Sequence, residues 1–459
     1  MAELDLAVTN AMITVAGMGT FRGSLGVADG TVVSLNAGDW VGPAREVIDA
    51  EGRHVLPGVF DAHSHYGLGG DDDFTTETKA ASRAGITTTL SYLLKQDLDY
   101  EPAFAQMRAE GEAKSLIDFG FHFGVSSKEQ AERLTLAADR FGVVSHKYFM
   151  SFKRPGEGDY IGVHAVHDGI LFQVMREVAK DPRVTLVVHS ENIEVVWSLA
   201  EELRASGADG LAAWNESRPD FTEAHDIGTV GMFSGVTGAR VFIPHVSTAA
   251  GVEAAKRFGA ARPILETCPH YLTHTCDDPS LGSLGKVNPP LRPASDVEAL
   301  WEAVFDGTID LIASDHNSRK RVNKERDIWT STAGFPGQGT MLPAILTEGV
   351  VRRGLSLERA VELLCASPAR IFGRYPKKGT LRPGADADFV IVDLESWTAP
   401  DPTTWGSYSD YSLHEGQKLT GWPVATYLRG RPIWSQTDGW AAPRGTYVPG
   451  TTADQGEDA

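Results

Sequence analysis

Short apolar segments that each carry a possible metal ligand near their end recur along this chain, and they constrain its fold more than any other feature. Five of them follow one another: GVFDAHSH with His63 and His65, VVSHKYF with Lys147, VTLVVHS with His189, RVFIPHV with His245, and IDLIASDH with Asp315. A single histidine at a strand end is most often a buried core residue. Five in order predict strands that lie side by side and converge on a hydrolytic centre for two metal ions.

The segment from Val55 to about Phe372 alternates apolar strands with amphipathic stretches such as FTTETKAASRAG and ILFQVMREVAKD. This alternation is typical of parallel β/α units. Eight candidate strands can be counted: VLPGVFDAHSH, ITTTLSYLL, DFGFHFGV, VVSHKYF, VTLVVHS, RVFIPHV, PILETCP and DLIASDH. They predict an α/β fold with a (β/α)8 TIM barrel over residues 55–374, whose active site lies at the carboxyl ends of the strands.

Both ends of the chain show a different pattern, in which short alternating apolar runs are separated by Gly, Asp and Asn turns. We expect residues 1–54 and 375–435 to pair with each other into a small β-sandwich module beside the barrel. Residues 436–459 are polar and rich in turn formers, which favours a mobile tail or one that lies against a partner.

Composition excludes several classes of function. A length of 459 residues suits a barrel with one smaller module, and a net charge of −19 argues against nucleic acid or an anionic membrane as a partner. The three cysteines form no CxxC pair, which favours a reducing compartment. No signal-peptide pattern and no apolar run of about 20 residues is found, so we expect a cytoplasmic protein without a membrane segment.

Lys147 is the least expected of the candidate ligands, because apolar residues surround it in VVSHKYFM. Burial beside cations lowers a lysine pKa and exposes the neutral amine. A neutral amine can add carbon dioxide to give a carbamate, an anion able to bridge two metal ions. The alternative is a lysine paired with a nearby acid. His146 points the opposite way along the strand and is interpreted as packing, whereas His63 and His65 share one face.

The motifs PGVFDAHSH, HKYFM, VVHSEN, PHVS and ASDH together resemble the cyclic-amide branch of the amidohydrolase superfamily: hydantoinases, dihydropyrimidinases, allantoinases and dihydroorotases. ETCPHYLT, KVNPPLR and GWPVAT look like further signatures, and the resemblance extends from about Val8 to Trp434. It implies two divalent ions, with zinc favoured over manganese, cobalt or iron. The ligand set that it implies is His63, His65 and Asp315 on the buried ion, His189 and His245 on the second, and carboxylated Lys147 between them.

The resemblance also implies a reaction. A hydroxide shared by the two ions would attack the amide carbon, since metal binding lowers the pKa of water towards about 7. Asp315 would accept the hydroxide proton and return it to the leaving nitrogen, first as general base and then as general acid. The product would be a ring-opened acid. Because relatives commonly form tetramers, we expect a homo-oligomer, either a tetramer or a dimer.

Two positions separate this chain from parts of the family. Gly67 stands where dihydroorotases carry an arginine that grips the substrate carboxylate, which argues against that activity. Phe152 stands where many D-hydantoinases and dihydropyrimidinases carry a tyrosine, although L-selective hydantoinases also lack it; an aromatic ring there would enclose a ring substituent. A hydantoin or dihydropyrimidine is the favoured substrate, with allantoin, a lactam or another amide or imide as alternatives.

The resemblance implies further substrate contacts at Asn288 in KVNPPLR and in the loop AGFPGQGTM, at Phe335 and Gly337. An asparagine can donate to a carbonyl and accept from an N–H, which matches the edge of a cyclic imide. An asparagine that caps a proline turn explains the presence of Asn288 equally well. Turns of an ordinary loop explain the glycines of AGFPGQGTM almost as well.

Two alternatives for the whole chain remain. A non-enzymatic scaffold of the dihydropyrimidinase-related kind keeps the fold and loses metal ligands, whereas all six candidate ligands are present here. A deaminase of the same superfamily would not need Lys147. The basic run SRKRVNKER after Asp315 is interpreted as a solvated face, with attraction of an acidic substrate as the alternative.

Overall fold

The computed structural model describes residues 3–39, 42–70 and 72–451, and within these ranges eight parallel strands form one sheet. Each strand pairs with its neighbours in chain order, from β6 to β13. A parallel bridge between Ser64 and His316 joins the first strand to the segment after the last and closes the barrel. The strands are β6 (Val59–Ser64), β7 (Ile86–Leu93), β8 (Asp118–Gly124), β9 (Ser145–Phe149), β10 (Thr185–His189), β11 (Val241–Ile243), β12 (Ile264–Thr267) and β13 (Leu311–Ile312). The predicted (β/α)8 fold is confirmed.

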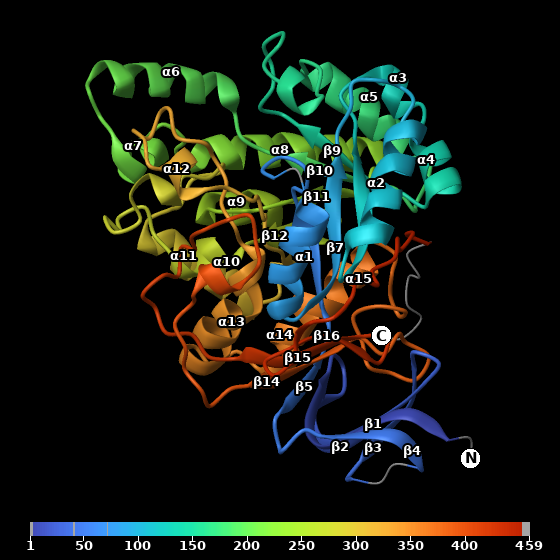
Figure 1. The fold of residues 1–459 in the computed structure, drawn as a ribbon. Helices are drawn as coiled ribbons and strands as arrows, with labels where there is room; N and C mark the ends of the chain where they lie inside the picture. The colour runs from blue at the N-terminus through green and yellow to red at the C-terminus, as the bar shows by residue number, and fades with distance from the viewer. Residues whose placement is uncertain (1–2, 40–41, 71, 452–459) are drawn as a thin grey trace.

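Helices surround these strands (Figure 1). Their ends follow local signals: Thr248 Oγ1 accepts from the Gly251 N–H at the start of α9, and Gly142, with φ of 64°, ends α4. None of the helices in the described ranges combines the length and apolar character needed to cross a bilayer. The helices are α1 (Asp73–Arg83), α2 (Glu101–Lys114), α3 (Lys128–Ala131), α4 (Leu134–Phe141), α5 (Asp168–Val178), α6 (Ile193–Ala205), α7 (Gly210–Glu216), α8 (Asp220–Thr237), α9 (Ala249–Lys256), α10 (Pro269–Thr273), α11 (Ala294–Phe305), α12 (Arg321–Lys324), α13 (Met341–Ile345), α14 (Leu357–Val361) and α15 (Ser367–Ile371).

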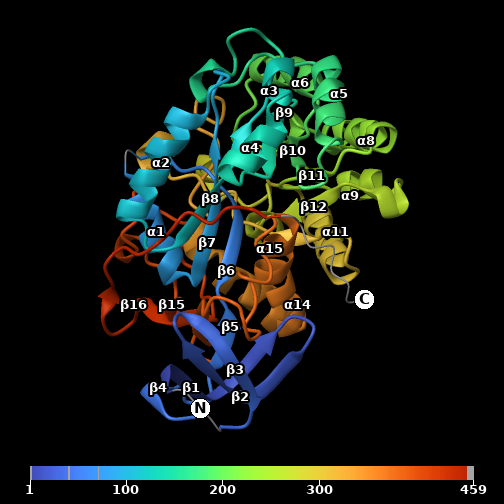
Figure 2. The ribbon, with the colours of Figure 1, turned by 90° about the vertical axis from the view of Figure 1, so that its right-hand side faces the viewer.

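Strands from the two ends of the chain form a second, mixed sheet, which lies below the barrel in Figures 1 and 2. The N-terminal strand β5 pairs antiparallel with the C-terminal strand β14, so both ends contribute to one sheet, as predicted. Its strands are β1 (Leu4–Val15), β2 (Gly19–Ala28), β3 (Thr31–Ala37), β4 (Ala44–Asp49), β5 (His54–Pro57), β14 (Phe389–Asp393), β15 (Trp422–Leu428), β16 (Arg431–Ser435) and β17 (Gly439–Trp440).

The segment expected as the first barrel strand divides at Gly58. Residues 54–57 form β5 of the terminal sheet, and only residues 59–64 belong to the barrel. A Cβ at Gly58 would lie 2.1 Å from Thr87 Oγ1, so the turn between the two sheets requires glycine. The expectation of one continuous strand was wrong, because the apolar run does not show where the chain changes sheets.

The segment after β17 packs against the barrel. Tyr447 is buried, and its backbone forms a parallel bridge with Phe119 of β8. The Tyr447 hydroxyl donates to the carbonyl of Phe141 at 2.6 Å, and the Gly450 N–H donates to Gly142 at 2.8 Å. Of the tail expected over residues 436–459, residues 439–440 therefore pair with β16 in the terminal sheet, residues 444–451 lie along the barrel, and residues 452–459 lie outside the described ranges.

Apolar side chains fill the barrel interior away from the ligand-bearing strand ends. This apolar cluster combines strand residues such as Phe60 and Phe242 with Ala369 and Phe372 from the α15 region. All of these side chains are almost fully buried. The interior at this level is therefore a packed core, and open space is left to the opposite end of the strands.

A buried lysine ties the barrel to the terminal sheet. Lys378 Nζ lies 2.5 Å from Asp118 of β8, 2.8 Å from Asp386 and 2.7 Å from Asp388. Burial alone would lower the pKa of Lys378, but the three carboxylates outweigh it and raise that pKa above its ordinary value. Arg429 also pairs with Asp118, so each charge in this cluster depends on the others.

Replacing Lys378 with methionine should destabilise the protein by about 3–5 kcal/mol, because buried carboxylates would lose their main counter-charge. The urea midpoint of unfolding measures this loss. Lys377→Met is the matched control, since Lys377 is exposed. Equal midpoints for both variants would contradict a stabilising role for the cluster.

Candidate metal centre

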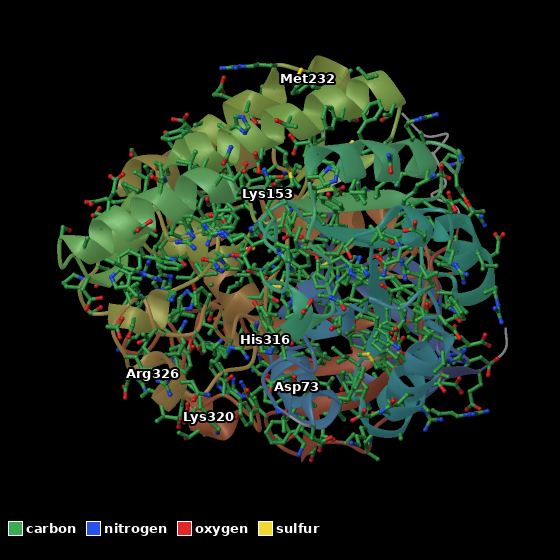
Figure 3. The ribbon with its side chains drawn as sticks, turned by 90° about the horizontal axis from the view of Figure 1, so that it is seen from above. Asp73, Lys153, Met232, His316, Lys320 and Arg326 are labelled. Carbon is green, nitrogen blue, oxygen red and sulfur yellow. The ribbon has the colours of Figure 1, made fainter. Side chains whose placement is uncertain are left out.

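The structure brings the strand-end residues together at one end of the barrel. His65, Lys147, His189, His245 and Asp315 all line one cavity of about 740 Å³. His63 lies just beneath the wall and is fully buried. Seen from above (Figure 3), His316, which follows Asp315, lies well inside the outline of the molecule, and Asp73 lies close to it. Six groups far apart in sequence therefore share one site.

His63, His65 and Asp315 form the tightest cluster. Asp315 Oδ1 lies 3.0 Å from His63 Nε2 and 3.2 Å from His65 Nε2. One ligand atom from each of the three residues falls within 4.8 Å of the others, a spacing that a single metal ion can span.

Glu266 of β12 orients the first imidazole. Its carboxylate lies 2.7 Å from His63 Nδ1 and also accepts from the backbone N–H of His245 at 3.1 Å. A neutral His63 must donate through Nδ1 to this carboxylate, which leaves a lone pair on Nε2. That lone pair faces the Asp315 oxygen and has no hydrogen-bond partner. In this neutral form two acceptors face each other, and either a metal ion or a second proton on His63, whose pKa is raised to about 9, would stabilise the contact.

His189 and His245 form a second pair of neighbouring imidazoles. His189 Nε2 lies 2.9 Å from the Glu191 carboxylate, so the neutral ring donates there and presents Nδ1 as an acceptor. Nδ1 lies 3.0 Å from His245 Nε2. The residues present therefore also fit a second cation, held by two imidazoles.

Lys147 lies among these groups and makes no ion pair with any residue that the structure describes. Its Nζ lies 4.9 Å from the ring centroids of both Tyr92 and Phe149. Burial lowers the pKa of Lys147 from its ordinary 10.5 to about 8, although Asp315 and Glu266 act in the opposite direction. A substantial fraction of the amine is therefore neutral near pH 8, which is the form that can add carbon dioxide.

The two histidines that share Asp315 titrate differently. Burial lowers the pKa of His65 to about 4, despite its contact with Asp315. For His63, burial acts in the same direction, but Glu266 and Asp315 outweigh it and raise the pKa to about 9. Burial also holds the pKa of His245 well below its usual range. Since His63 lies between two carboxylates, this position is the one where positive charge is most stabilised.

Two of the candidate ligands have strained backbones. His245 has φ of 44° and Asp315 has φ of 48°, in the left-handed region that residues with a Cβ rarely adopt. Such conformations cost about 1–3 kcal/mol each and persist where the surrounding structure fixes them. Their occurrence at two strand ends that carry ligands points to a functional site.

The side chains expected at the substrate fall into two groups. Phe152 and Asn288 line the cavity, as does Gly334. Phe335 and Gly337 are not among the lining residues: Phe335 is buried against the His270 ring, with centroids 4.8 Å apart. Gly337 lies against the last barrel strand, where a Cβ would fall 2.5 Å from the Ser314 carbonyl oxygen.

Sequence reasoning missed the carboxylates behind the ligands. Asp61 accepts from Ser314 through both its N–H at 2.9 Å and its Oγ at 2.6 Å, and from Gln338 Nε2 at 2.7 Å. Asp61, Glu191 and Glu266 each precede or follow a candidate ligand or lie inside an apolar strand. An acid within an apolar strand is itself a signal, because a buried carboxylate requires partners.

Comparisons with known proteins agree with this geometry. Residues 54–433 match the model of the amidohydrolase family. An L-hydantoinase from Paenarthrobacter aurescens is 34% identical over 449 residues, which cover 94% of this chain and 94% of that protein. An allantoinase from Deinococcus radiodurans is 34% identical over 456 residues, or 96% of this chain and 98% of the relative.

Solved structures of hydantoinases are also similar to this chain over nearly its whole length. An L-hydantoinase (dihydropyrimidinase) from Arthrobacter aurescens superposes with a TM-score of 0.89 at 32% sequence identity. The match covers 97% of this chain and 100% of that one. A D-hydantoinase matches with a TM-score of 0.88 at 27% identity, over 97% of this chain and 99% of the other.

Glu266→Gln should weaken metal retention about 10- to 100-fold, because the amide no longer holds His63 by a charge-assisted contact. Dialysis of metal-loaded protein against graded chelator, followed by elemental analysis, measures this change. Asp226→Asn is the control, since Asp226 is a buried carboxylate on α8 that contacts no candidate ligand. Equal retention in both variants would contradict the role assigned to Glu266.

At a fixed concentration of dissolved carbon dioxide, the rate at which metal-free protein takes up Zn²⁺ should rise with pH and level off above about 8, the pKa of Lys147. Because this pKa is depressed from 10.5, the unfolded chain binds more protons between those values, and metal-free protein should gain stability over that window. Lys147→Met should show neither effect. A bicarbonate-independent rate in the wild type would contradict carboxylation.

Proposed function

This chain belongs to the amidohydrolase family as a hydrolase of cyclic-amide C–N bonds, and from that premise we propose that its substrate is a hydantoin or a dihydropyrimidine. One observation carries the proposal: two sets of metal-compatible ligands open on the same cavity, with an unpaired lysine between them. This arrangement suits a binuclear centre better than a single-metal site or a scaffold.

Two divalent cations, zinc or alternatively manganese, cobalt or iron, would supply an acidified water and a polarised carbonyl when bound. His63, His65 and Asp315 would hold one of them, and His189 and His245 the other. Carboxylated Lys147 would lie between the two and balance part of their charge.

Asp315 is the proposed proton carrier. Burial alone would raise its pKa, but His63 and His65 outweigh that effect and hold the carboxyl well below its usual range. An ionised carboxylate in the cavity wall can accept a proton from the attacking water. It then returns that proton to the leaving ring nitrogen, acting first as a base and then as an acid.

Asn288 and Phe152 would orient the ring. The Oδ1 atom of Asn288 is buried and has no hydrogen-bond partner, although the residue lines the cavity. An acceptor left unpaired in this way matches a ring N–H, while the Nδ2 group of the same amide can donate to a ring carbonyl. Phe152 would then pack against the ring substituent.

Allantoin is the second candidate substrate. It is a hydantoin that carries a ureido substituent, and a cavity of about 740 Å³ leaves room beyond the ring. The allantoinase from Deinococcus radiodurans is as similar to this chain as the L-hydantoinase is, at 34% identity.

A spectrophotometric panel of hydantoins, dihydrouracil and allantoin, applied to metal-loaded protein, tests the proposal. We expect ring opening of a hydantoin or dihydropyrimidine, and Asp315→Asn should lower kcat about 10²- to 10⁴-fold, because the proton carrier is lost. Circular dichroism checks that the variant is folded. Protein with bound metal that opens no ring of the panel, or an Asp315→Asn variant with unchanged kcat, would contradict the account.

A further inference from the structure

One cation in the cavity wall has no function in the reaction described above. Arg319 belongs to the basic segment 318–326 that follows Asp315, and it lines the same cavity as Lys147 and Asp315. The other cations of the segment do not line this cavity. Arg321 pairs with Glu415 at 2.6 Å, and Lys320 and Arg326 lie towards the rim of the molecule, away from His316 (Figure 3).

Within the described ranges, only the Nη1 atom of the Arg319 guanidinium makes hydrogen bonds. Its Nη1 donates to the carbonyl of Leu68 at 2.7 Å, and its backbone N–H donates to Ser409 Oγ at 2.9 Å. Nε is buried without a hydrogen-bond partner, and Nη2 has no acceptor among the described residues. The edge formed by Nε and Nη2 therefore has no acceptor in the described ranges; Nε is shielded in this conformation, which leaves Nη2 as the donor for a carboxylate oxygen in the cavity.

No carboxylate of the described ranges lies within ion-pair distance of Arg319. Burial lowers the pKa of this arginine and outweighs the opposite effect of Asp73 and the neighbouring tyrosines. A half-buried cation without a counter-ion is unfavourable, and an anion that enters the cavity would relieve it. Among the described residues Asp73 acts on Arg319 electrostatically, but no carboxylate makes an ion pair with it.

Other charges in the wall are already engaged. Glu191 contacts His189 and lies 3.7 Å from Arg218, and Asp315 contacts two histidines. Glu157 is the remaining carboxylate in the wall, and its Oε2 accepts from the Arg154 N–H at 3.2 Å. It makes no ion pair with Arg319, so it is the one group that could instead favour a cationic substituent.

Arg319 lies beside the loop that follows His65, on the side of the cavity where we expect the ring substituent of the substrate. Leu68, to which Arg319 is bound, lies in the loop that directly follows His65. A Cβ at Gly67 in this loop would meet no atom within 4 Å, so the space beside it is open. The guanidinium therefore stands at the edge of the cavity, where a ring substituent would extend once the amide reaches the strand ends.

We propose that Arg319 selects cyclic ureides whose ring substituent carries a carboxylate, an inference that rests on the proposed function. The reaction is unchanged: water adds across the C–N bond, a C–O bond forms, and the leaving nitrogen takes the proton. The product is an N-carbamoyl compound with two carboxylates, one from the ring and one from the substituent. Arg319 is a specificity-determining residue that touches the substituent and not the reacting atoms.

Steady-state kinetics of the metal-loaded protein test the inference with matched substrates, 5-(2-carboxyethyl)hydantoin and its neutral analogue 5-(2-carbamoylethyl)hydantoin. Arg319→Gln should lower kcat/KM for the carboxylate about 10- to 100-fold, since a charge-assisted contact is lost. The loss should appear mainly in KM, because the contact is made equally in the ground and transition states. For the neutral amide the change should stay below about threefold.

Two further variants control the experiment. Arg326→Gln removes the same charge from the same segment at an exposed position outside the cavity and should change neither substrate. Arg319→Lys keeps the charge without the fork of donors, so its loss should be intermediate. Calorimetric binding of the N-carbamoyl dicarboxylate product gives a readout independent of turnover, and it should weaken in Arg319→Gln relative to Arg326→Gln.

The outcomes separate the two proposals. Failure of the wild-type protein to open any hydantoin contradicts the proposed function. Turnover of neutral hydantoins with no preference for the carboxylate, or an equal effect of Arg319→Gln on both substrates, overturns the role of Arg319 alone. A preference for 5-(2-aminoethyl)hydantoin would do the same and would point to Glu157.

Discussion

The candidate metal site of this protein depends on buried carboxylates that fix which nitrogen of an imidazole carries its proton. Glu266 directs the Nδ1 proton of His63 towards itself, and the remaining nitrogen then faces Asp315 at 3.0 Å. Glu191 does the same for His189, whose other nitrogen faces His245 at 3.0 Å. While His63 is neutral, its contact with Asp315 joins two acceptors and is unfavourable until a proton or a metal ion lies between them, whereas a neutral His245 can donate from Nε2 to His189 Nδ1. We infer that positive charge in this cavity is part of the native state.

The rest of the fold holds these groups in place against strain. Asp315 and His245 lie in left-handed backbone conformations, and Asp61 fixes the strand end at Ser314 through two hydrogen bonds. The His65 N–H donates to the His316 carbonyl at 2.8 Å and the His316 N–H donates to the His63 carbonyl at 3.4 Å, which closes the barrel beside the site. Below, Phe60 and other apolar side chains fill the interior, so the ligands stand on a rigid base. The ion pairs of Lys378 with Asp118 of β8 and with Asp388 connect the barrel to the terminal sheet.

Much of this was predictable from local pattern, because strand ends of a parallel barrel meet at one face and alternate residues share a side. That reasoning places His63, His65, Lys147, His189, His245 and Asp315 around one cavity, where the structure also has them. The change of sheet at Gly58 depends on contact with Thr87, which is distant in sequence and therefore invisible to periodicity. The sequence also did not predict that Arg319 lines the cavity. A run of basic residues is typical of a solvated surface, yet Arg319 belongs to the cavity wall. Polar composition likewise gave no sign that Tyr447 packs against β8.

The most direct test of the central claim is the number of metal ions bound by each chain. Elemental analysis of wild-type protein reconstituted with Zn²⁺ and bicarbonate, and then desalted, should give about two equivalents per chain, since the cavity offers two separate ligand sets. A value near zero after saturating reconstitution would contradict the claim that these ligand sets bind metal ions. A value near one would contradict the binuclear centre.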